Sequence, residues 1–248
     1  MTFVSTRNGR SLRNYILIAA AALTLGAGLA AEPRPRAVPG SGSGGLFVAD
    51  KGKFRIAVNG QPIGSEEFEI HPNGDRWLAQ GNVEIHSAQG GLTHIHSHLT
   101  LQPDGEPVHY DWSTDGEKTA SAEIQFQSSV ATIVLQLPNK KPFTQQFTFT
   151  SPLVAVLDNN LYHQYGILAR LYDRSKSGQQ TFSVLVPQEL TPGSVTVESL
   201  GPSAVAGSEK LEELRVQTSD LEVDLYLDGK GRLMRLVAPS SNAEVVRE

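Results

Sequence analysis

The sequence contains no cysteine. The chain therefore has no disulfide, no thiol nucleophile for catalysis and no cysteine ligand for zinc, and no thiol near its N-terminus is available for lipid attachment. Small exported domains often depend on disulfides. Because this chain has none, its stability must come from a hydrophobic core.

Positive charge is scarce. The 248 residues include 21 Lys and Arg against 26 Asp and Glu, which gives a formal net charge of −5. Nucleic acids and anionic membrane surfaces attract proteins through clustered basic faces. We therefore expect no nucleic-acid partner. The hydrophobic fraction of 39% is typical of a globular protein rather than a disordered one.

The one long apolar run is near the N-terminus. Three arginines within residues 7–13 precede an Ala- and Leu-rich run over 15–29, and small residues follow it. This is the arrangement of a secretory signal peptide, and the run is shorter than the roughly 20 residues that span a bilayer. We interpret residues 1–31 as a signal peptide that is cleaved after Ala30 or Ala31. The mature protein is then exported to the periplasm or the extracellular space, with no transmembrane segment.

Two further regions follow this signal. Residues 32–45 read EPRPRAVPGSGSGG, a Pro, Gly and Ser mixture typical of a flexible linker. Residues 46–248 are predicted to form a single β-rich domain.

Short segments with alternating apolar and polar residues fill most of this domain. Phe54, Ile56 and Val58 alternate in this way ahead of Asn59-Gly60, a strong turn signal. The pattern predicts about a dozen antiparallel strands, the last over 233–237. A sheet of this length curls. We expect a large curved antiparallel sheet, a half-barrel or incomplete barrel, with two stacked sheets as the alternative.

One segment departs from the alternating pattern. Ser151-Pro152 is a typical helix start, and apolar residues recur at spacings of three and four from Leu153 to Tyr172. The spacing predicts a single interrupting helical segment over 152–173 that covers the concave face of the sheet. Within it, the polar group from Asp158 to His163 is interpreted as the side of the helix that faces water, because residues five apart share a helical face poorly.

The order of these elements resembles a known group of proteins. A strand-turn-strand unit spans Phe54 to Glu69, a helix interrupts the strands, and the hairpin DGKGRLMRL closes the series from Asp228. This pattern resembles exported bacterial β-rich families of unknown function, whose fold is similar to the periplasmic lipoprotein carriers. The resemblance implies a curved sheet, closed by helix, that binds acyl chains.

Histidines form the most conspicuous polar pattern. His94, His96 and His98 alternate along one predicted strand, so their side chains share a face, and His86 lies on the expected partner strand. Imidazoles placed in this way suit zinc, copper or nickel. Because the opposite face of the strand is apolar, the same residues also fit a solvated outer surface. Both interpretations, the metal site and the solvated face, are left open.

The apolar residues expected on the concave face are candidates for ligand binding. They come from the strand before the helical segment and from that segment itself: Phe147, Phe149, Leu157, Leu161 and Leu168. Concave apolar surfaces are where apolar ligands bind. The same residues would also serve as plain core.

Motifs of nucleophilic, phosphate-binding and metalloprotease sites are absent from the sequence. We expect no enzyme and no cofactor. The function predicted is an exported, non-enzymatic binding or carrier protein for an apolar or amphiphilic small molecule in the bacterial cell envelope. The alternative is an envelope scaffold that holds another protein on the edge or surface of its sheet.

Overall fold

The computed structural model describes residues 45–248 apart from 88–89, 117–118 and 204–209. The predicted signal peptide, 1–31, and all but the last residue of the predicted linker, 32–45, lie outside the described residues.

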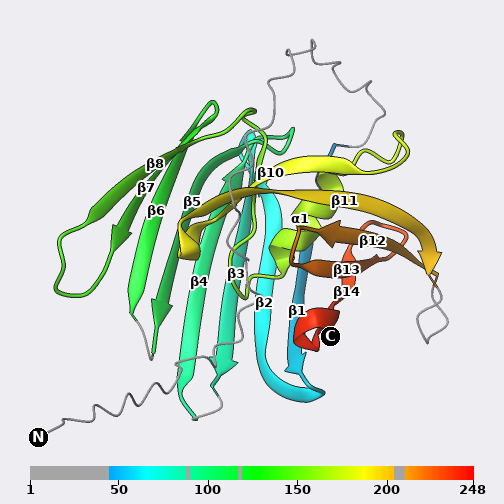
Figure 1. Ribbon diagram of the computed structural model, residues 1–248, viewed down its shortest axis with the longest axis horizontal. Coiled ribbons are helices and arrows are strands. Elements are labelled where there is room, and N and C mark those ends of the chain that lie inside the picture. The colour runs from blue at the N-terminus through cyan, green and yellow to red at the C-terminus, as the bar shows by residue number, and fades with distance from the viewer. Residues whose placement is uncertain (1–44, 88–89, 117–118, 204–209) are drawn as a thin grey trace, which may run out of the picture.

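The described chain forms one sheet of 15 strands and one α-helix (Figure 1). The strands before the helix are β1 (Asp50–Val58), β2 (Gln61–Asn73), β3 (Arg76–His86), β4 (Leu92–Leu101), β5 (Pro107–Asp115), β6 (Ala120–Gln127), β7 (Val130–Gln136), β8 (Phe143–Thr148) and β9 (Val154–Val156). Helix α1 (His163–Leu171) follows. The later elements are β10 (Gln180–Val186), η1 (Pro187–Glu189), β11 (Thr191–Ser203), β12 (Leu211–Gln217), β13 (Glu222–Leu227), β14 (Leu233–Ala238), η2 (Pro239–Ser241) and β15 (Ala243–Arg247).

The strands follow the order β8 to β1 and then β15 down to β9. Each neighbouring pair in the described chain is antiparallel except β9 and β10, which run parallel. In Figure 1, β1 to β8 form a curved wall, and β10 and β11 run across it. These findings confirm the predicted large, curved, mainly antiparallel sheet with one helical segment.

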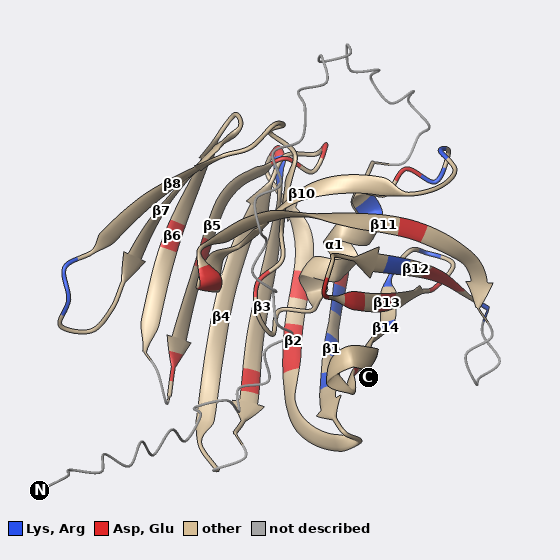
Figure 2. Ribbon diagram, viewed as in Figure 1, with Lys and Arg blue, Asp and Glu red and all other residues tan. Residues whose placement is uncertain are grey.

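The alternation of residue types explains which face of the sheet is buried. Phe54 and Ile56 on β1 are fully buried, and side chains of this size each stabilise the fold by about 1.5–3 kcal/mol when they leave water. On the opposite face, Lys51 and Lys53 pair with acidic residues of β2. Figure 2 shows blue Lys and Arg bands on β1 beside red Asp and Glu bands on β2. The core therefore lies inside the curve of the sheet.

The helical segment is shorter than predicted. The prediction placed a helix over 152–173, but residues 154–156 form strand β9 and only His163–Leu171 are helical. The Ser151 hydroxyl accepts a hydrogen bond from the Leu153 amide in a turn rather than capping a helix. The apolar spacing was misleading because its first members, Leu153, Leu157 and Leu161, flank the short buried strand β9 or follow it, and they pack against the core without forming a helical turn.

Strand β15 has no counterpart among the predicted strands. It pairs with both β1 and β14 and so joins the two halves of the sheet. Arg247 on β15 forms a nearly buried ion pair with Asp50 on β1, with Nη2 2.6 Å from Oδ1. No helix in the described part of the chain is long and apolar enough to cross a membrane.

Candidate functional site

The segment 157–163, between β9 and α1, lies inside the curve of the sheet and is fixed there by two buried carboxylates. Glu66 on β2 holds its end, and Asp158 holds its beginning. The polar group from Asp158 to His163 was predicted to face water, and that prediction is wrong because both residues are buried. These groups face hydrogen-bonding partners on the strands instead of solvent.

Glu66 caps the start of helix α1 from a neighbouring strand. One of its oxygens accepts hydrogen bonds from the amides of Tyr162, at 2.8 Å, and His163, at 3.2 Å. The other lies 2.6 Å from Nδ1 of the His163 ring. Amides at a helix N-terminus have no partner within the helix and favour negative charge. Glu66 therefore supplies by tertiary contact the cap that the local sequence lacks.

The His163 ring fits closely among apolar groups of β2 and β3. It stacks on Phe68, with ring centroids 6.0 Å apart. A Cβ at Gly81 would lie 2.7 Å from its Cε1 atom, so glycine is needed at that position for the helix to approach the sheet. The Nε2 atom is buried and has no hydrogen-bond partner among the described residues. The pair of Glu66 and His163 thus serves as a buried anchor for α1.

Asp158 links the same segment to β5 and to the turn after β10. Its oxygens accept hydrogen bonds from the Tyr110 hydroxyl at 2.8 Å, the Gln188 amide at 2.9 Å and the Asn159 amide at 3.0 Å. Burial raises the pKa of this carboxyl to about 6, and the hydrogen bonds oppose the rise. Asp158 therefore has no cationic partner in the described structure, and its pKa lies about one unit below neutral pH.

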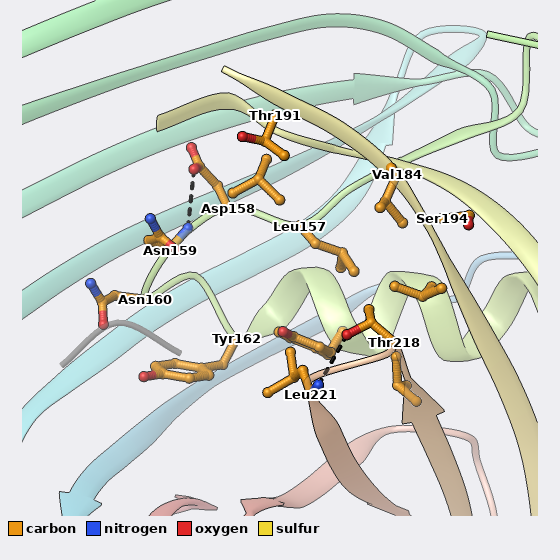
Figure 3. Close-up of a pocket in the computed structure, with 15 residues that line it drawn as sticks. Leu157, Asp158, Asn159, Asn160, Tyr162, Val184, Thr191, Ser194, Thr218 and Leu221 are labelled. Carbon is orange, nitrogen blue, oxygen red and sulfur yellow. Dashed lines mark hydrogen bonds between the residues drawn. The ribbon is translucent and has the colours of Figure 1, made fainter. Parts of the chain in front are cut away.

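A narrow pocket of about 60 Å³ separates this segment from strands β10, β11 and β12 (Figure 3). Apolar side chains form its walls: Leu157, Val184, Val186, Val195, Val216 and Leu221. Asp158, Asn159 and Asn160 gather at one end, as Figure 3 shows. The pocket therefore has an apolar body and a polar end, which is the usual composition of a small-molecule site.

Two tyrosines of the helical segment complete the lining. Burial raises the pKa of the Tyr165 hydroxyl to about 12 and that of Tyr162 further still, where the charge of Glu66 adds to the effect. Both hydroxyls therefore remain protonated at neutral pH. They can donate hydrogen bonds to a bound molecule but cannot act as bases there.

The structure places the predicted ligand-binding residues in different locations. Leu157 lines the pocket. Leu161 and Leu168 are fully buried core residues, and Leu161 contacts Gly81. Phe147 and Phe149 are partly buried beside β7, near the other end of the sheet. The structure thus brings one of the five to the pocket, and the other four pack in or against the core.

The four predicted metal ligands share the outer face of β3 and β4. Nδ1 of His96 lies 2.7 Å from the Asn82 amide oxygen, and Nδ1 of His98 lies 3.0 Å from Asp111. His94 lies 3.6 Å from Glu84, and His86 is exposed at the end of β3. No three metal-ligating side chains in the described part of the chain are grouped closely enough to hold an ion. The metal site stays a prediction.

Glu66 and Tyr110 were not predicted from the sequence as residues that hold segment 157–163. The position of Glu66 along β2 could have indicated its role. Glu66 has the same parity along β2 as Phe68 and Ile70, which face the core. A charged residue in an apolar row indicates a buried partner. Tyr110 shows no such signal, because a tyrosine in an apolar row looks like ordinary core.

Comparisons with known proteins show the fold and leave the family open. No family model and no curated protein matches the chain. A crystal structure of a β-barrel-like domain of unknown function, DUF1849, from Brucella abortus is similar with a TM-score of 0.58 and 8% identity, covering 83% of this chain and 97% of that one. A DUF1089 family protein from Pseudomonas aeruginosa gives a TM-score of 0.42 and 11% identity, covering 84% and 98%. The first likeness supports the fold alone, an open, curved, β-barrel-like sheet.

Proposed function

We propose that this protein binds a slim apolar or amphiphilic molecule, without reacting with it, in the pocket between segment 157–163 and strands β10 to β12. The observation that carries the proposal is the division of the pocket into an apolar body and a polar end. Each buried methylene of a ligand contributes about 0.8 kcal/mol, and the polar end sets its orientation.

The chemistry of the polar end narrows the class of ligand. Asp158 has no cationic partner within the described structure, and Asn159 and Asn160 beside it are neutral. A carboxylate head group placed there would be repelled by Asp158 in its charged form. A hydroxyl, amide or ammonium head group would instead donate a hydrogen bond. We therefore expect short-chain alcohols or amines to bind better than the matching carboxylic acids.

Calorimetric titration of the full chain with propylamine, propanol and propanoate at pH 7 tests this function, because a pocket of about 60 Å³ takes only a short chain. Replacing Leu221, which lines the pocket, by Trp fills the apolar body and should lower affinity at least about tenfold, equivalent to about 1.4 kcal/mol. The matched control is Leu137→Trp, since Leu137 is an exposed leucine before β8. Equal binding by both variants, or no binding at all, would contradict the proposal.

We also propose that the protein acts after export to the cell envelope. The basis is the signal-peptide pattern over residues 1–31. Intact mass measurement of the protein recovered from the periplasm or the medium should show a chain that begins after Ala30 or Ala31. A full-length chain confined to the cytoplasm would overturn this part of the proposal.

A second candidate function is favoured by the end of the sheet at β8. This strand pairs only with β7 in the described structure, and Phe143 on it is 51% exposed. Unpaired strand edges accept a strand from another protein. Envelope proteins captured with wild-type protein but not with Phe143→Lys, in the absence of a bound small molecule, would favour the scaffold function over the carrier function.

A further inference from the structure

A second hollow, distinct from the pocket, lies at the other end of helix α1. It has a volume of about 670 Å³, and the end of α1, the end of β11, the start of β12 and the hairpin between β13 and β14 form its walls. We call it the basic basin. It shares no lining residue with the pocket between segment 157–163 and the sheet. Its charged lining residues are Arg170, Arg174, Lys210, Lys230, Glu212 and Asp228.

Each carboxylate around Arg170 already holds a different arginine. Nε of Arg174 donates to both oxygens of Glu212, at 3.0 and 2.9 Å. In the same way, Arg232 binds Asp228 at 2.7 Å and Arg247 binds Asp50 at 2.6 Å. Arg170 is half-buried and has no ion pair with any described residue. Asp50 and Asp228 thus act on the Arg170 guanidinium through space, while their own ion pairs are with Arg247 and Arg232.

The surroundings of Arg170 act on its charge in opposite directions. Burial lowers the pKa of its guanidinium, and the charge of Arg174 lowers it further, although Asp50 and Asp228 partly offset both effects. Arg170 lies in the last turn of α1, where the helix dipole favours a cation, and Arg174 donates to the Ala169 carbonyl at the same end, at 3.3 Å. Figure 2 shows blue Lys and Arg segments on α1 and in the turn that follows it.

Lys230 adds a second cation from the hairpin tip. It is exposed and, like Arg170, forms no ion pair within the described chain. Its neighbours Gly229 and Gly231 carry no side chains that would block approach to the basin. Lys210, just before β12, is a third lining cation with no ion pair in the described chain. Cations of this kind, one of them a planar guanidinium, match a group with two negative charges and several acceptor oxygens, and phosphate has these properties.

We propose that the basic basin binds the phosphate group of a phosphate-bearing ligand, with Arg170 as the principal contact and Lys230 as the second. The phosphate accepts hydrogen bonds from the guanidinium, and Lys230 interacts with it as a point charge. The volume of the basin is within the range of small-molecule sites. The source of the phosphate is either a soluble phosphoester or the head group of a phospholipid.

Calorimetric titration of the full chain with inorganic phosphate, and sedimentation with phosphatidylglycerol or phosphatidylcholine vesicles, test the proposal. We expect Arg170→Gln to weaken binding at least about tenfold and Lys230→Gln to weaken it less, with binding that falls as salt rises. Lys51→Gln is the control, since Lys51 lies on β1 outside the basin and pairs with Glu69.

The outcomes distinguish a soluble phosphate ligand, a lipid head group and no phosphate site. Phosphate binding that Arg170→Gln weakens supports a soluble ligand, and binding restricted to phosphatidylglycerol vesicles, with the same sensitivity, supports a lipid head group. No binding of either probe overturns the proposal. Binding that Lys51→Gln weakens as much as Arg170→Gln also overturns it, because general surface charge would then be the cause. The Lys230→Gln variant changes an exposed hairpin residue and keeps the test valid if Arg170→Gln fails to fold.

Discussion

Carboxylate–histidine pairs occur on both faces of the sheet, and they differ in burial. On the inner face, Glu66 and His163 are 2.6 Å apart and neither side chain is exposed. On the outer face, His98 and Asp111 are 3.0 Å apart with side chains 48% and 41% exposed. Glu66 also accepts hydrogen bonds from the two amides that begin α1. The outer pair is exposed, so water can solvate both of its side chains. The comparison indicates that a carboxylate–histidine contact holds α1 in place when it is buried on the inner face. The same contact adds little stability when it is exposed on the outer face.

Removing the two carboxylates separately gives the largest expected difference. In Glu66→Leu, the two amides and the His163 ring lose their acceptor inside the core, and we expect the free energy of unfolding to fall by about 3–5 kcal/mol. In Asp111→Leu, we expect a loss below about 1 kcal/mol. Urea denaturation of both variants measures these losses. Similar losses for the two would show that burial does not set the strength of these pairs.

The second buried carboxyl, Asp158, gives the inner face a dependence on pH. Its pKa is raised to about 6, so the folded state holds the proton more tightly than the unfolded state does. The stability that Asp158 contributes is therefore present at low pH and is lost as the pH rises through about 6. The stability of wild type relative to Asp158→Asn should fall by roughly 2 kcal/mol between pH 4 and pH 7.

Unfolding curves of the two proteins at several pH values measure this difference. Other titrating groups are common to both proteins and cancel. A constant difference across the range would show that Asp158 is charged throughout, as the exposed carboxylates of the outer face are.

Gly81 tests how closely the inner pair is packed. A Cβ there would lie 2.7 Å from the His163 ring and 2.9 Å from Leu161, so Gly81→Ala must displace α1 and should cost about 1–3 kcal/mol. Gly229→Ala is the control, because nothing lies within 4 Å of a Cβ at that position. Thermal melting compares them. A Gly81→Ala variant as stable as Gly229→Ala would mean that the helix has freedom to move.

The outer histidines should give the smallest effect. Hydrogen bonds of His96 and His98 to Asn82 and Asp111 favour the solvated face over the metal site. We expect Zn²⁺, Ni²⁺ or Cu²⁺ at pH 7.5 to leave the melting temperature unchanged in wild type and in His96→Ala. A metal-dependent rise that wild type shows and His96→Ala lacks would establish the metal site. Binding at a hundredfold excess over Kd would add about 2.7 kcal/mol.

The sequence predicts the sheet well and its interior contacts poorly. Alternation along β1 or β4 is a local signal that each residue carries, and it gave the fold class correctly. The helix boundary depends instead on Glu66, about a hundred residues from His163 along the chain, and local patterns do not report such a contact. Local sequence patterns do not predict the polar end of the pocket for the same reason, since Tyr110 and Asp158 come into contact only in the curved sheet.

The pairing of β1 with β15 limits when the sheet can be completed during folding. Phe54 pairs with Arg247, so β15, which follows all the other strands of the described chain, lies near the centre of the sheet and not at its border. Until β15 is in place, β1 and β14 each present an unpaired edge, and the two arcs of the sheet cannot join. Contacts of such long sequence separation form slowly. The sheet therefore cannot be completed before β15 is synthesised, and loss of residues 243–247 alone would leave two open edges at the centre of the sheet.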